Sequence, residues 1–442
     1  MNLAHYLGRE NLHMYRYFLY TCILLVLGST SLTAQTPAFQ YSNQTYVSHL
    51  QTIIFGPTGY PHLFPLIDLN SGETLSLSFD DLENDIRNYT YKVIHCDRDW
   101  QPSGLAPLEY INGFEEENIP TYNFSSRTLQ NYINYSLTFP NRNMSPTKSG
   151  NYLLVVFEDE DEKRAVITRR FVVVDRQMGV SAEFVRPMEV SKIHTHQEID
   201  FIVNFQRLSV RNAMAEMSAS VLQNQRWDNA ITGIKPKFLQ SDKAIFDFQG
   251  EIVFPGGSEF RLIDLRSLRI PHRDIEYMDV NLDNQMEAEL LPVINRSKAP
   301  HLAFIDFNGR FLIENLDMPL ANVQSEYVYT LLSFKVDEPL FDDHVYLLGA
   351  ITEWQLKPEF QFRYNPATTS YVGRFPLKQG YYNYYLATAP SNADPKQPLV
   401  PSIMKTEGSH ADTENDYQIL VYYRPFGTRY DQLVGFLQAN SQ

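Results

Sequence analysis

Short runs of strand-forming residues recur along almost the whole chain, separated by residues that favour turns. The 442 residues include 28 Phe and 28 Tyr, which favour strands, and 25 Pro and 20 Gly, which favour turns. Thr74–Phe79 alternates hydroxyl and apolar side chains, as a strand with one buried face does. This pattern predicts an all-β chain built from tandem antiparallel β-sandwich modules.

A hairpin is the clearest local prediction. Asn151–Phe157 is apolar on both faces, which is typical of a central strand. The acidic turn Glu158–Lys163 follows it, and Arg164–Asp175 is the return strand. Ala213–Leu222 holds good helix formers, so a helix remains an alternative there. Its alternation and the polar turn after it favour a strand.

Two changes of pattern divide the chain into modules. One follows the strand that ends near Asp175, and the other is the polar stretch Asn295–Pro300. A chain of this length has room for two to four domains. We therefore expect a signal peptide over residues 1–34, an N-terminal sandwich over 35–176, a middle sandwich over 177–297 and a C-terminal sandwich over 298–442.

The N-terminal segment has the parts of a secretory signal peptide. Arg16 precedes the apolar run Tyr17–Leu27, and small residues lead to a cleavage site after Ala34. The run is shorter than the roughly 20 apolar residues that a membrane-spanning helix needs, although a retained anchor helix is an alternative. We expect the chain from Gln35 to be exported. Cleavage would leave Cys96 as a lone thiol without an internal disulfide partner.

The charge of the chain excludes some partners. The formal net charge is −15, and Lys and Arg do not cluster beyond pairs such as Arg169-Arg170. Such a chain does not attract the phosphate backbone of nucleic acids. After the signal peptide there is no second long apolar run, so we expect no membrane-spanning helix in the mature protein.

The sequence offers little catalytic chemistry. It contains no nucleophile elbow, zincin motif, P-loop or dinucleotide fingerprint. His194 and His196 would share one face of a strand, but zinc requires a third protein ligand and none is near in sequence. The acidic turn Glu158–Glu162 lacks the glycine of a calcium loop. We predict no catalytic, cofactor-binding or metal-binding residue and no enzyme activity, with a hydrolase using the carboxylates of Asp80–Asp85 as a minor alternative.

Aromatic residues form the remaining candidate surface. The strand-like run from Val345 leads through a short loop to Trp354, and Tyr371–Leu386 ends in the aromatic return strand Y-Y-N-Y-Y-L. This arrangement resembles starch- and glycogen-binding sandwich modules, whose loop and surface aromatic rings stack on sugars.

The return strand can expose only one of its two pairs of tyrosines. Tyr382 and Tyr384 share one face, while Tyr381 and Tyr385 share the other, so one pair belongs to the core. A sugar platform would need the outward pair and Trp354 exposed together. The candidate interface or ligand surface comprises Trp354, Tyr371, Tyr382 and Tyr384.

A wider resemblance covers nearly the whole mature chain. It is carried by H-C-D-R-D-W at His95–Trp100, L-E-Y-I-N-G-F at Leu108–Phe114, S-G-N-Y-L-L-V-V-F at Ser149–Phe157, the run Glu407–Arg424 and R-Y-D-Q-L-V-G at Arg429–Gly435. These segments resemble the plug protein of the Bacteroidota type IX secretion system. The resemblance implies a periplasmic protein at the inner face of the outer membrane that closes the periplasmic opening of the translocon barrel, its partner.

The function that we predict from the sequence is therefore that of a non-enzymatic sealing subunit without a cofactor. A pore wide enough for folded cargo leaks unless a rigid body blocks it, and such a blocker needs no catalytic groups. A periplasmic carbohydrate-binding protein is the alternative. The predicted fold is all-β, with sandwiches of immunoglobulin-like or E-set-like type after a cleaved signal peptide.

Overall fold

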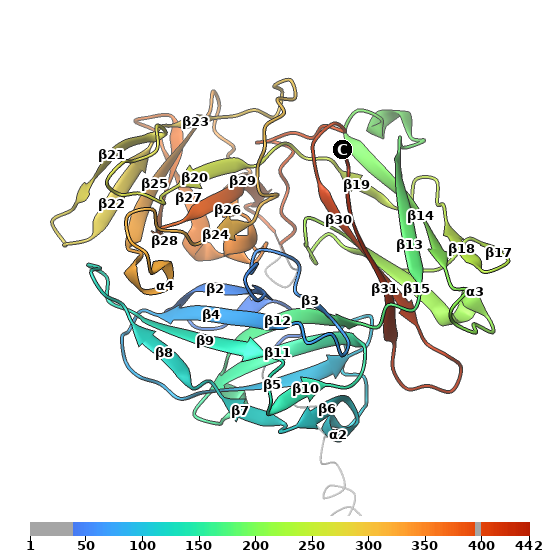
Figure 1. Ribbon diagram of the computed structural model, residues 1–442. Coiled ribbons are helices and arrows are strands. Elements are labelled where there is room, and N and C mark those ends of the chain that lie inside the picture. Colours follow the sequence, from blue (N-terminus) through green and yellow to red (C-terminus); the bar gives the residue numbers. More distant parts are fainter. Residues whose placement is uncertain (1–38, 394–398) are drawn as a thin grey trace, which may run out of the picture. The chain divides into compact units, whose positions relative to one another are not determined.

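The computed structural model describes residues 39–393 and 399–442, and the regular structure there is almost entirely β-strand (Figure 1). The all-β prediction is confirmed, and the strands form several mainly antiparallel sheets. The predicted signal peptide, residues 1–34, lies outside the described residues. Among the described helices, none is long and apolar enough to cross a bilayer.

Twelve strands form the first sandwich, together with the short helix α2 (Pro107–Tyr110) and the 3₁₀ turn η1 (Glu162–Arg164). They are β1 (Gln44–Thr45), β2 (Leu50–Pro57), β3 (Leu66–Asp68), β4 (Leu75–Asp81), β5 (Tyr89–Cys96), β6 (Ile111–Gly113), β7 (Glu116–Asn118), β8 (Thr121–Phe124), β9 (Ile133–Phe139), β10 (Met144–Pro146), β11 (Gly150–Glu158) and β12 (Ala165–Val174). One main sheet has the order β1-β12-β11-β5-β7 with β3 beside β12, and the other has the order β2-β4-β9-β8. β6 and β10 form a separate two-stranded sheet. Because side chains alternate along each strand, one set from each sheet meets in a shared core that includes Phe79 and Tyr152.

β11 and β12 form the predicted hairpin. Their register runs from Gly150 opposite Val173 to Phe157 opposite Ala165. β11 lies between β12 and β5 and is buried from Gly150 to Phe157, as its two apolar faces predict. The central strand and its return strand are therefore both confirmed.

The middle sandwich combines two segments that are far apart in sequence. Its strands are β13 (Gly179–Val185), β14 (His196–Asn204), β15 (Met217–Gln223), β16 (Ile231–Ile234), β17 (Phe238–Gln240), β18 (Lys243–Phe246), β19 (Val253–Pro255), β30 (Asp416–Tyr423) and β31 (Gln432–Asn440), with the turn η2 (Val190–Lys192) and the helix α3 (Ala213–Glu216). One sheet has the order β13-β14-β18-β17 with β19 beside β14, and the other has the order β16-β15-β30-β31. Ala213–Leu222 thus begins as one helical turn and continues as a strand.

The third sandwich is formed by one ten-stranded sheet, with the order β20-β29-β26-β27-β28-β25-β22-β21 and with β23 beside β25 and β24 beside β29. Its strands are β20 (Arg261–Asp264), β21 (Ile275–Val280), β22 (Met286–Leu290), β23 (Val293–Ile294), β24 (Phe311–Leu312), β25 (Tyr327–Lys335), β26 (Asp343–Leu348), β27 (Gln361–Asn365), β28 (Ser370–Lys378) and β29 (Tyr381–Pro390), with α4 (Ala321–Gln324), η3 (Ala350–Thr352) and η4 (Pro358–Phe360). Ile263 of β20 and Leu290 of β22, from opposite ends of the sheet order, share one core. The sheet therefore folds over on itself.

The strand pairing corrects the predicted boundary between the ranges 177–297 and 298–442. β20 to β23 were expected in the middle sandwich. Instead, β20 pairs with β29, β22 and β23 pair with β25, and β21 pairs with β22, all in the third sandwich. β30 and β31 were expected in the C-terminal sandwich, but β30 pairs with β15 along its length. This pairing buries Tyr417 and Ile419 in the middle core. The choice of partner depends on contacts across about 200 residues, for which local pattern gives no signal.

A separate apolar cluster joins the first and middle sandwiches. Leu153 and Val172 of the first sandwich belong to the same buried cluster as Leu222, Leu420 and Leu433 of the middle one. The outer face of the β11–β12 hairpin is therefore covered by another module, and this explains why β11 is apolar on both faces.

Candidate functional site

A cavity of about 130 Å³ lies where the three sandwiches meet, and we call it the junction cavity. Its polar and aromatic lining consists of Asn43, Phe55, His62, Phe64, Arg169 and Arg170 from the first sandwich, Asn224, Gln225 and Trp227 from the middle one, and Arg310, Phe311, Glu353 and Trp354 from the third. Pockets at domain interfaces are frequent ligand sites. The junction cavity is therefore the candidate functional site.

All three tryptophans of the chain lie at the junction cavity or directly beside it. Trp227 and Trp354 line it, and Trp100 packs against Trp227 with a centroid separation of 4.8 Å and an interplanar angle of 82°. The Arg170 guanidinium lies 4.4 Å from the Trp100 ring centroid and 5.2 Å from that of Trp227. Arg226 lies 4.5 Å from the Trp354 centroid. Each indole ring therefore has an arginine guanidinium of the protein itself against it.

Two loops of the cavity wall hold consecutive residues in the left-handed region of backbone space. Asn224 and Gln225 have φ of 55° and 63°, and Glu353 and Trp354 have φ of 57° and 59°. For residues other than glycine this conformation costs about 1–2 kcal/mol each. Such strain persists where surrounding contacts fix it, and it clusters at functional sites.

Glu353 joins the third sandwich to the first. Its carboxylate accepts hydrogen bonds from Arg169 Nη2 at 2.5 Å, Thr45 Oγ1 at 2.6 Å and Lys357 Nζ at 2.7 Å. Burial alone would raise the pKa of Glu353, but Arg169 and Lys357 outweigh it and hold the pKa at about 2. The carboxylate is therefore fully committed to partners within the protein.

A second buried ion pair joins the same two sandwiches. Lys378 Nζ of β28 lies 2.6 Å from Asp80 Oδ2 of β4, and both side chains are almost inaccessible to solvent. Tyr327 donates a hydrogen bond to the same Asp80 oxygen at 2.7 Å, and Tyr132 places its ring 4.3 Å from the ammonium. Burial lowers the pKa of Lys378, and Asp80 opposes that effect. Asp80 therefore holds the two sandwiches together. It is buried and already paired, so it cannot serve as a catalytic carboxylate in the hydrolase alternative.

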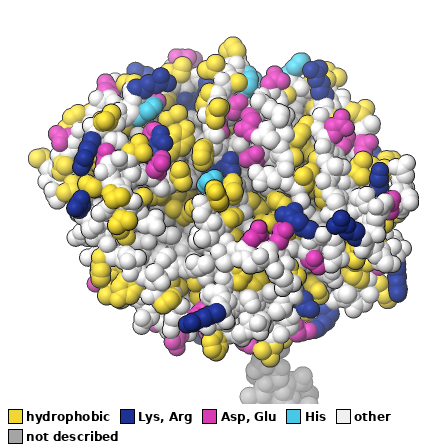
Figure 2. Space-filling view, viewed as in Figure 1, with side chains coloured by type: hydrophobic (Ala, Val, Ile, Leu, Met, Phe, Trp, Pro, Cys, Tyr) yellow, Lys and Arg dark blue, Asp and Glu magenta, His cyan; other side chains and the backbone are white. Residues whose placement is uncertain are grey.

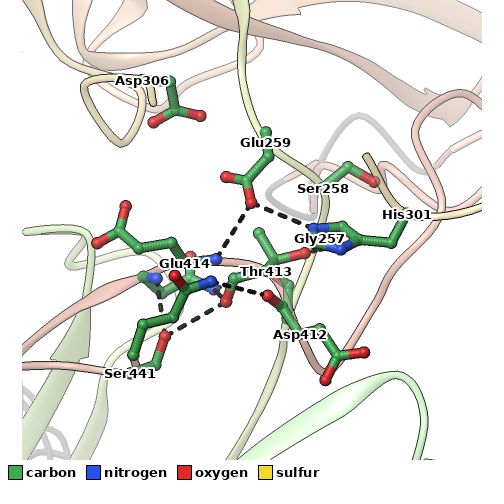
Figure 3. Close-up of polar contacts among 12 residues, drawn as sticks. Gly257, Ser258, Glu259, His301, Asp306, Asp412, Thr413, Glu414 and Ser441 are labelled. Atoms are coloured by element: carbon green, nitrogen blue, oxygen red, sulfur yellow. Dashed lines mark hydrogen bonds and ion pairs between the residues drawn. The ribbon is translucent and has the colours of Figure 1, made fainter. Parts of the chain in front are cut away.

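Three carboxylate side chains lie together where the middle and third sandwiches meet (Figure 3), and we call this group the acidic seam. It consists of Glu259, Asp306 and Glu414. Glu259 Oε1 lies 3.2 Å from His301 Nε2 and accepts the backbone N–H of Glu414 at 3.3 Å. Asp306 accepts the backbone N–H groups of Phe260 and of Asn308, the latter at 2.6 Å.

Asp306 is the most perturbed carboxyl group of this seam. Burial raises the pKa of Asp306 to about 7, and the carboxylates of Glu259 and Glu414 add to the rise. The two backbone N–H groups oppose it. Among the described residues no group of three or more His, Cys, Asp or Glu side chains has a geometry that could hold a metal ion. Asp306 is therefore the group of this seam that titrates closest to neutral pH.

The first sandwich is similar to a known protein family. Residues 50–175 match the family described as type 9 secretion system plug protein 1st domain. The first sandwich belongs to that family. The match covers β2 to β12, which is less than half of the chain. No curated protein matches the chain.

A solved structure extends the likeness beyond the plug domain. The crystal structure of a hypothetical protein from Parabacteroides merdae matches with a TM-score of 0.84 and 28% sequence identity. The match covers 91% of this chain and 100% of that protein. The three-sandwich arrangement around the plug domain is therefore shared by another protein.

Of the four aromatic residues predicted from the sequence, only Trp354 lines a cavity. Tyr371 is 5% exposed, and Tyr382 and Tyr384 are 1% exposed, all in the core of the third sandwich. Tyr385, on the other face of β29, is also buried, next to Phe260. The expected aromatic platform is therefore corrected, because other parts of the protein cover both faces of β29.

The other sequence hypotheses fall outside the junction cavity. Cys96 is a buried free thiol, and burial raises its pKa to about 12, which makes it an unreactive core residue. His194 and His196 both line a separate surface pocket beside Gln197.

Sequence reasoning missed most of the junction cavity. Arg170 was noted only as half of a basic pair, and His62, Trp227 and Arg310 were not singled out. Trp227 carried the only usable signal, as one of three tryptophans in 442 residues. The other side chains meet only after three modules have packed together.

Proposed function

We propose that the protein is a non-enzymatic periplasmic subunit that seals the periplasmic opening of the type IX secretion translocon barrel. The observation that carries this proposal is the match of residues 50–175 to the plug protein first domain. The proposal places the protein at the inner face of the outer membrane, with the barrel protein as its partner.

The contacts between the sandwiches suit a rigid subunit that seals a pore. The pairs Asp80–Lys378 and Arg169–Glu353 link the first sandwich to the third, and an apolar cluster links the first to the middle. Buried charge pairs are costly to separate, because each leaves an uncompensated charge. A body held together in this way resists deformation by cargo on the other side of a pore.

The surface offers apolar side chains for a large contact. Figure 2 shows hydrophobic side chains interspersed with charged ones over one face of the protein. Leu282, Ile305 and Phe426 are examples of apolar residues that are fully or almost fully exposed. Apolar side chains surrounded by charged ones are typical of interfaces that also exist in an undocked state.

Deletion of the gene tests the proposal in cells. Without the stopper the barrel stays open, so sensitivity to an antibiotic too large for ordinary porins should rise, and a plasmid copy should restore resistance. Affinity purification of the tagged protein should recover an outer-membrane barrel. Unchanged permeability together with no barrel in the purified material would rule the proposal out.

The carbohydrate alternative lacks a stacking surface among the predicted residues. Tyr371, Tyr382 and Tyr384 are buried, and Arg226 lies against the ring of Trp354. Sugar stacking requires an open aromatic face. We therefore keep the sealing function as the single proposal.

A further inference from the structure

The junction cavity contains hydrogen-bond donors that the protein does not satisfy. Arg170 donates from Nε and Nη2 to the backbone carbonyl of Tyr41, at 2.8 and 2.5 Å. Within residues 39–393 and 399–442 its Nη1 donates no hydrogen bond and no carboxylate forms an ion pair with it, so this nitrogen is left to solvent or a ligand. Burial lowers the pKa of the Arg170 guanidinium to about 10. A partly buried guanidinium without a counter-ion is destabilised, so an anion at this place would stabilise it.

Arg310 and His62 add further polar groups to the lining of the junction cavity. Arg310 donates to Phe307 O and Asp416 Oδ2 from Nε and Nη2, and no acceptor for its Nη1 is seen in the described part of the chain. His62 Nδ1 is buried without a partner there. A buried polar atom without a partner, such as His62 Nδ1, is rare in native proteins and often marks a missing ligand or water.

The charge balance of the lining is positive. Arg169, Arg170 and Arg310 line the cavity, and Glu353 is its one carboxylate among the described lining residues. Glu353 is already bound by Arg169, Lys357 and Thr45, and Arg310 is paired with Asp416. Among the described residues, Arg170 is therefore the lining cation without a carboxylate partner. A positive cavity is notable in a chain with a net charge of −15, and it selects for anions.

The size and the aromatic walls restrict the ligand further. The volume of about 130 Å³ is well below that of a drug-sized pocket, which is about 300–1,000 Å³. Trp227, Trp354, Phe55 and Pro61 supply apolar wall area. A small anion with oxygen acceptors, with or without an apolar substituent, fits both conditions.

We propose that the junction cavity binds a small oxyanion, a carboxylate or a phosphate, whose oxygens accept hydrogen bonds from Arg170 of the first sandwich and Arg310 of the third. The geometry of guanidinium groups suits both ligand types. Gln225 and Trp227 of the middle sandwich complete the wall. A ligand at this position touches all three modules and stabilises their association.

Intrinsic fluorescence gives a direct test, because all three tryptophans lie at or beside this cavity. The full chain is titrated with sodium phosphate and, separately, with sodium benzoate, against sodium chloride at equal ionic strength. We expect a saturable fluorescence change with at least one of the two anions and none with chloride. Saturation by phosphate alone identifies a phosphate ligand, and saturation by benzoate alone identifies a carboxylate. If neither phosphate nor benzoate gives a saturable fluorescence change, the proposal is wrong.

Two substitutions locate the binding site. Arg170→Gln removes the guanidinium and should weaken binding about tenfold or more, as expected for a charged hydrogen bond. Asn43→Asp is the second variant, because Asn43 Oδ1 accepts the backbone N–H of Arg170 at 2.7 Å and aspartate keeps that acceptor. The added negative charge supplies Arg170 with an internal partner, so the variant should fold while losing anion binding.

The matched control is Arg374→Gln. Arg374 also lies over an aromatic ring, 3.9 Å from the centroid of Tyr329, but it pairs with Glu287 at the surface of the third sandwich. Its binding curve should stay within about twofold of that of the unmodified protein. Equal affinity of Arg170→Gln, Asn43→Asp and the unmodified protein would overturn the proposal even if an anion binds elsewhere.

Discussion

Gly309 is the residue on which the position of Trp354 depends most directly. Its φ is +76°, and a Cβ atom built on it would lie 2.2 Å from Trp354 Cη2 and 2.7 Å from Phe260 Cε1. No side chain fits in this space. The absence of a side chain at residue 309 therefore allows the indole to reach the junction cavity.

Gly309→Ala should lower the free energy of unfolding by about 3 kcal/mol or more, because overpacking adds to the left-handed backbone penalty. Urea unfolding measures the effect. Gly72→Ala is the control, because Gly72 has φ of +81° and open space around it, so only the backbone penalty of about 1–2 kcal/mol applies. Equal losses in the two variants would contradict the role of the close contact.

Single residues at the junction cavity were predictable only in part. Trp354 stood out because tryptophan is rare and the surrounding strands resembled a sugar-binding module. Tyr382 and Tyr384 were misjudged because alternation shows which residues share a face, but not whether a second layer covers that face. Arg170 gave no signal, because an unpaired guanidinium can be recognised only once its neighbours are known.

At the level of elements, β4 and β28 are joined by one buried charge pair. Lys378 closes the end of β28, and Asp80 lies near the end of β4 in a different sandwich. Asp80 also accepts hydrogen bonds from Tyr327 and Asn134. The pair is therefore part of a network that fixes the first sandwich against the third.

Lys378→Met should destabilise the protein by about 3–5 kcal/mol, because it leaves Asp80 buried and without its cation. The double variant Asp80→Asn/Lys378→Met should recover a large part of this loss, because it removes both charges. Chemical unfolding of the single and double variants measures the coupling.

The exposed pair of Lys192 and Glu189 supplies the control for that experiment. The side chains are 36% and 55% exposed, and Lys192→Met should change stability by less than about 1 kcal/mol. A double variant as unstable as Lys378→Met alone would show that the charge pair is not what holds these two strands together.

The strands themselves were largely predictable. Thr74–Phe79 and the hairpin around Glu158–Lys163 both occur as expected, because alternation and turn residues are local signals. The assignment of β20 to β23 and of β30 and β31 to their sandwiches was not predictable. Register and partner are set by packing between segments that are distant in sequence.

At the scale of the whole molecule, the described residues form one compact unit, Phe39–Gln442. The acidic seam between the middle and third sandwiches is one of its internal boundaries. Asp306 there has a pKa of about 7 against an ordinary value of 3.8, so the folded state holds its proton more tightly than the unfolded state does. This group stabilises the fold fully below about pH 4, and the contribution is lost as the pH rises through 7.

Asp306→Asn should therefore gain stability relative to the unmodified protein on going from pH 5 to pH 8, by about 2 kcal/mol. An amide cannot ionise, so the variant lacks this part of the pH dependence. Any constant cost from replacing one acceptor oxygen is the same at both pH values. Urea unfolding of the two proteins at pH 5 and pH 8 gives the difference.

The exposed Asp283→Asn is the control, and its stability difference should be the same at both pH values. All other groups, including buried histidines, are common to the two proteins being compared and cancel. A stability difference for Asp306→Asn that does not change between pH 5 and pH 8 would show that Asp306 is not protonated in the folded state.

The return of β30 and β31 to the middle sandwich has a consequence for biosynthesis. Half of one four-stranded sheet is supplied by residues 416–440, which leave the ribosome after the entire third sandwich. The nascent middle module must wait with an open edge and an unfilled core for about 150 residues of further synthesis. This order of synthesis favours the binding of a chaperone to the unfinished middle sandwich during that interval. A chain that ends before residue 416 would lack two strands of the middle sandwich, so even a late truncation should prevent that sandwich from folding.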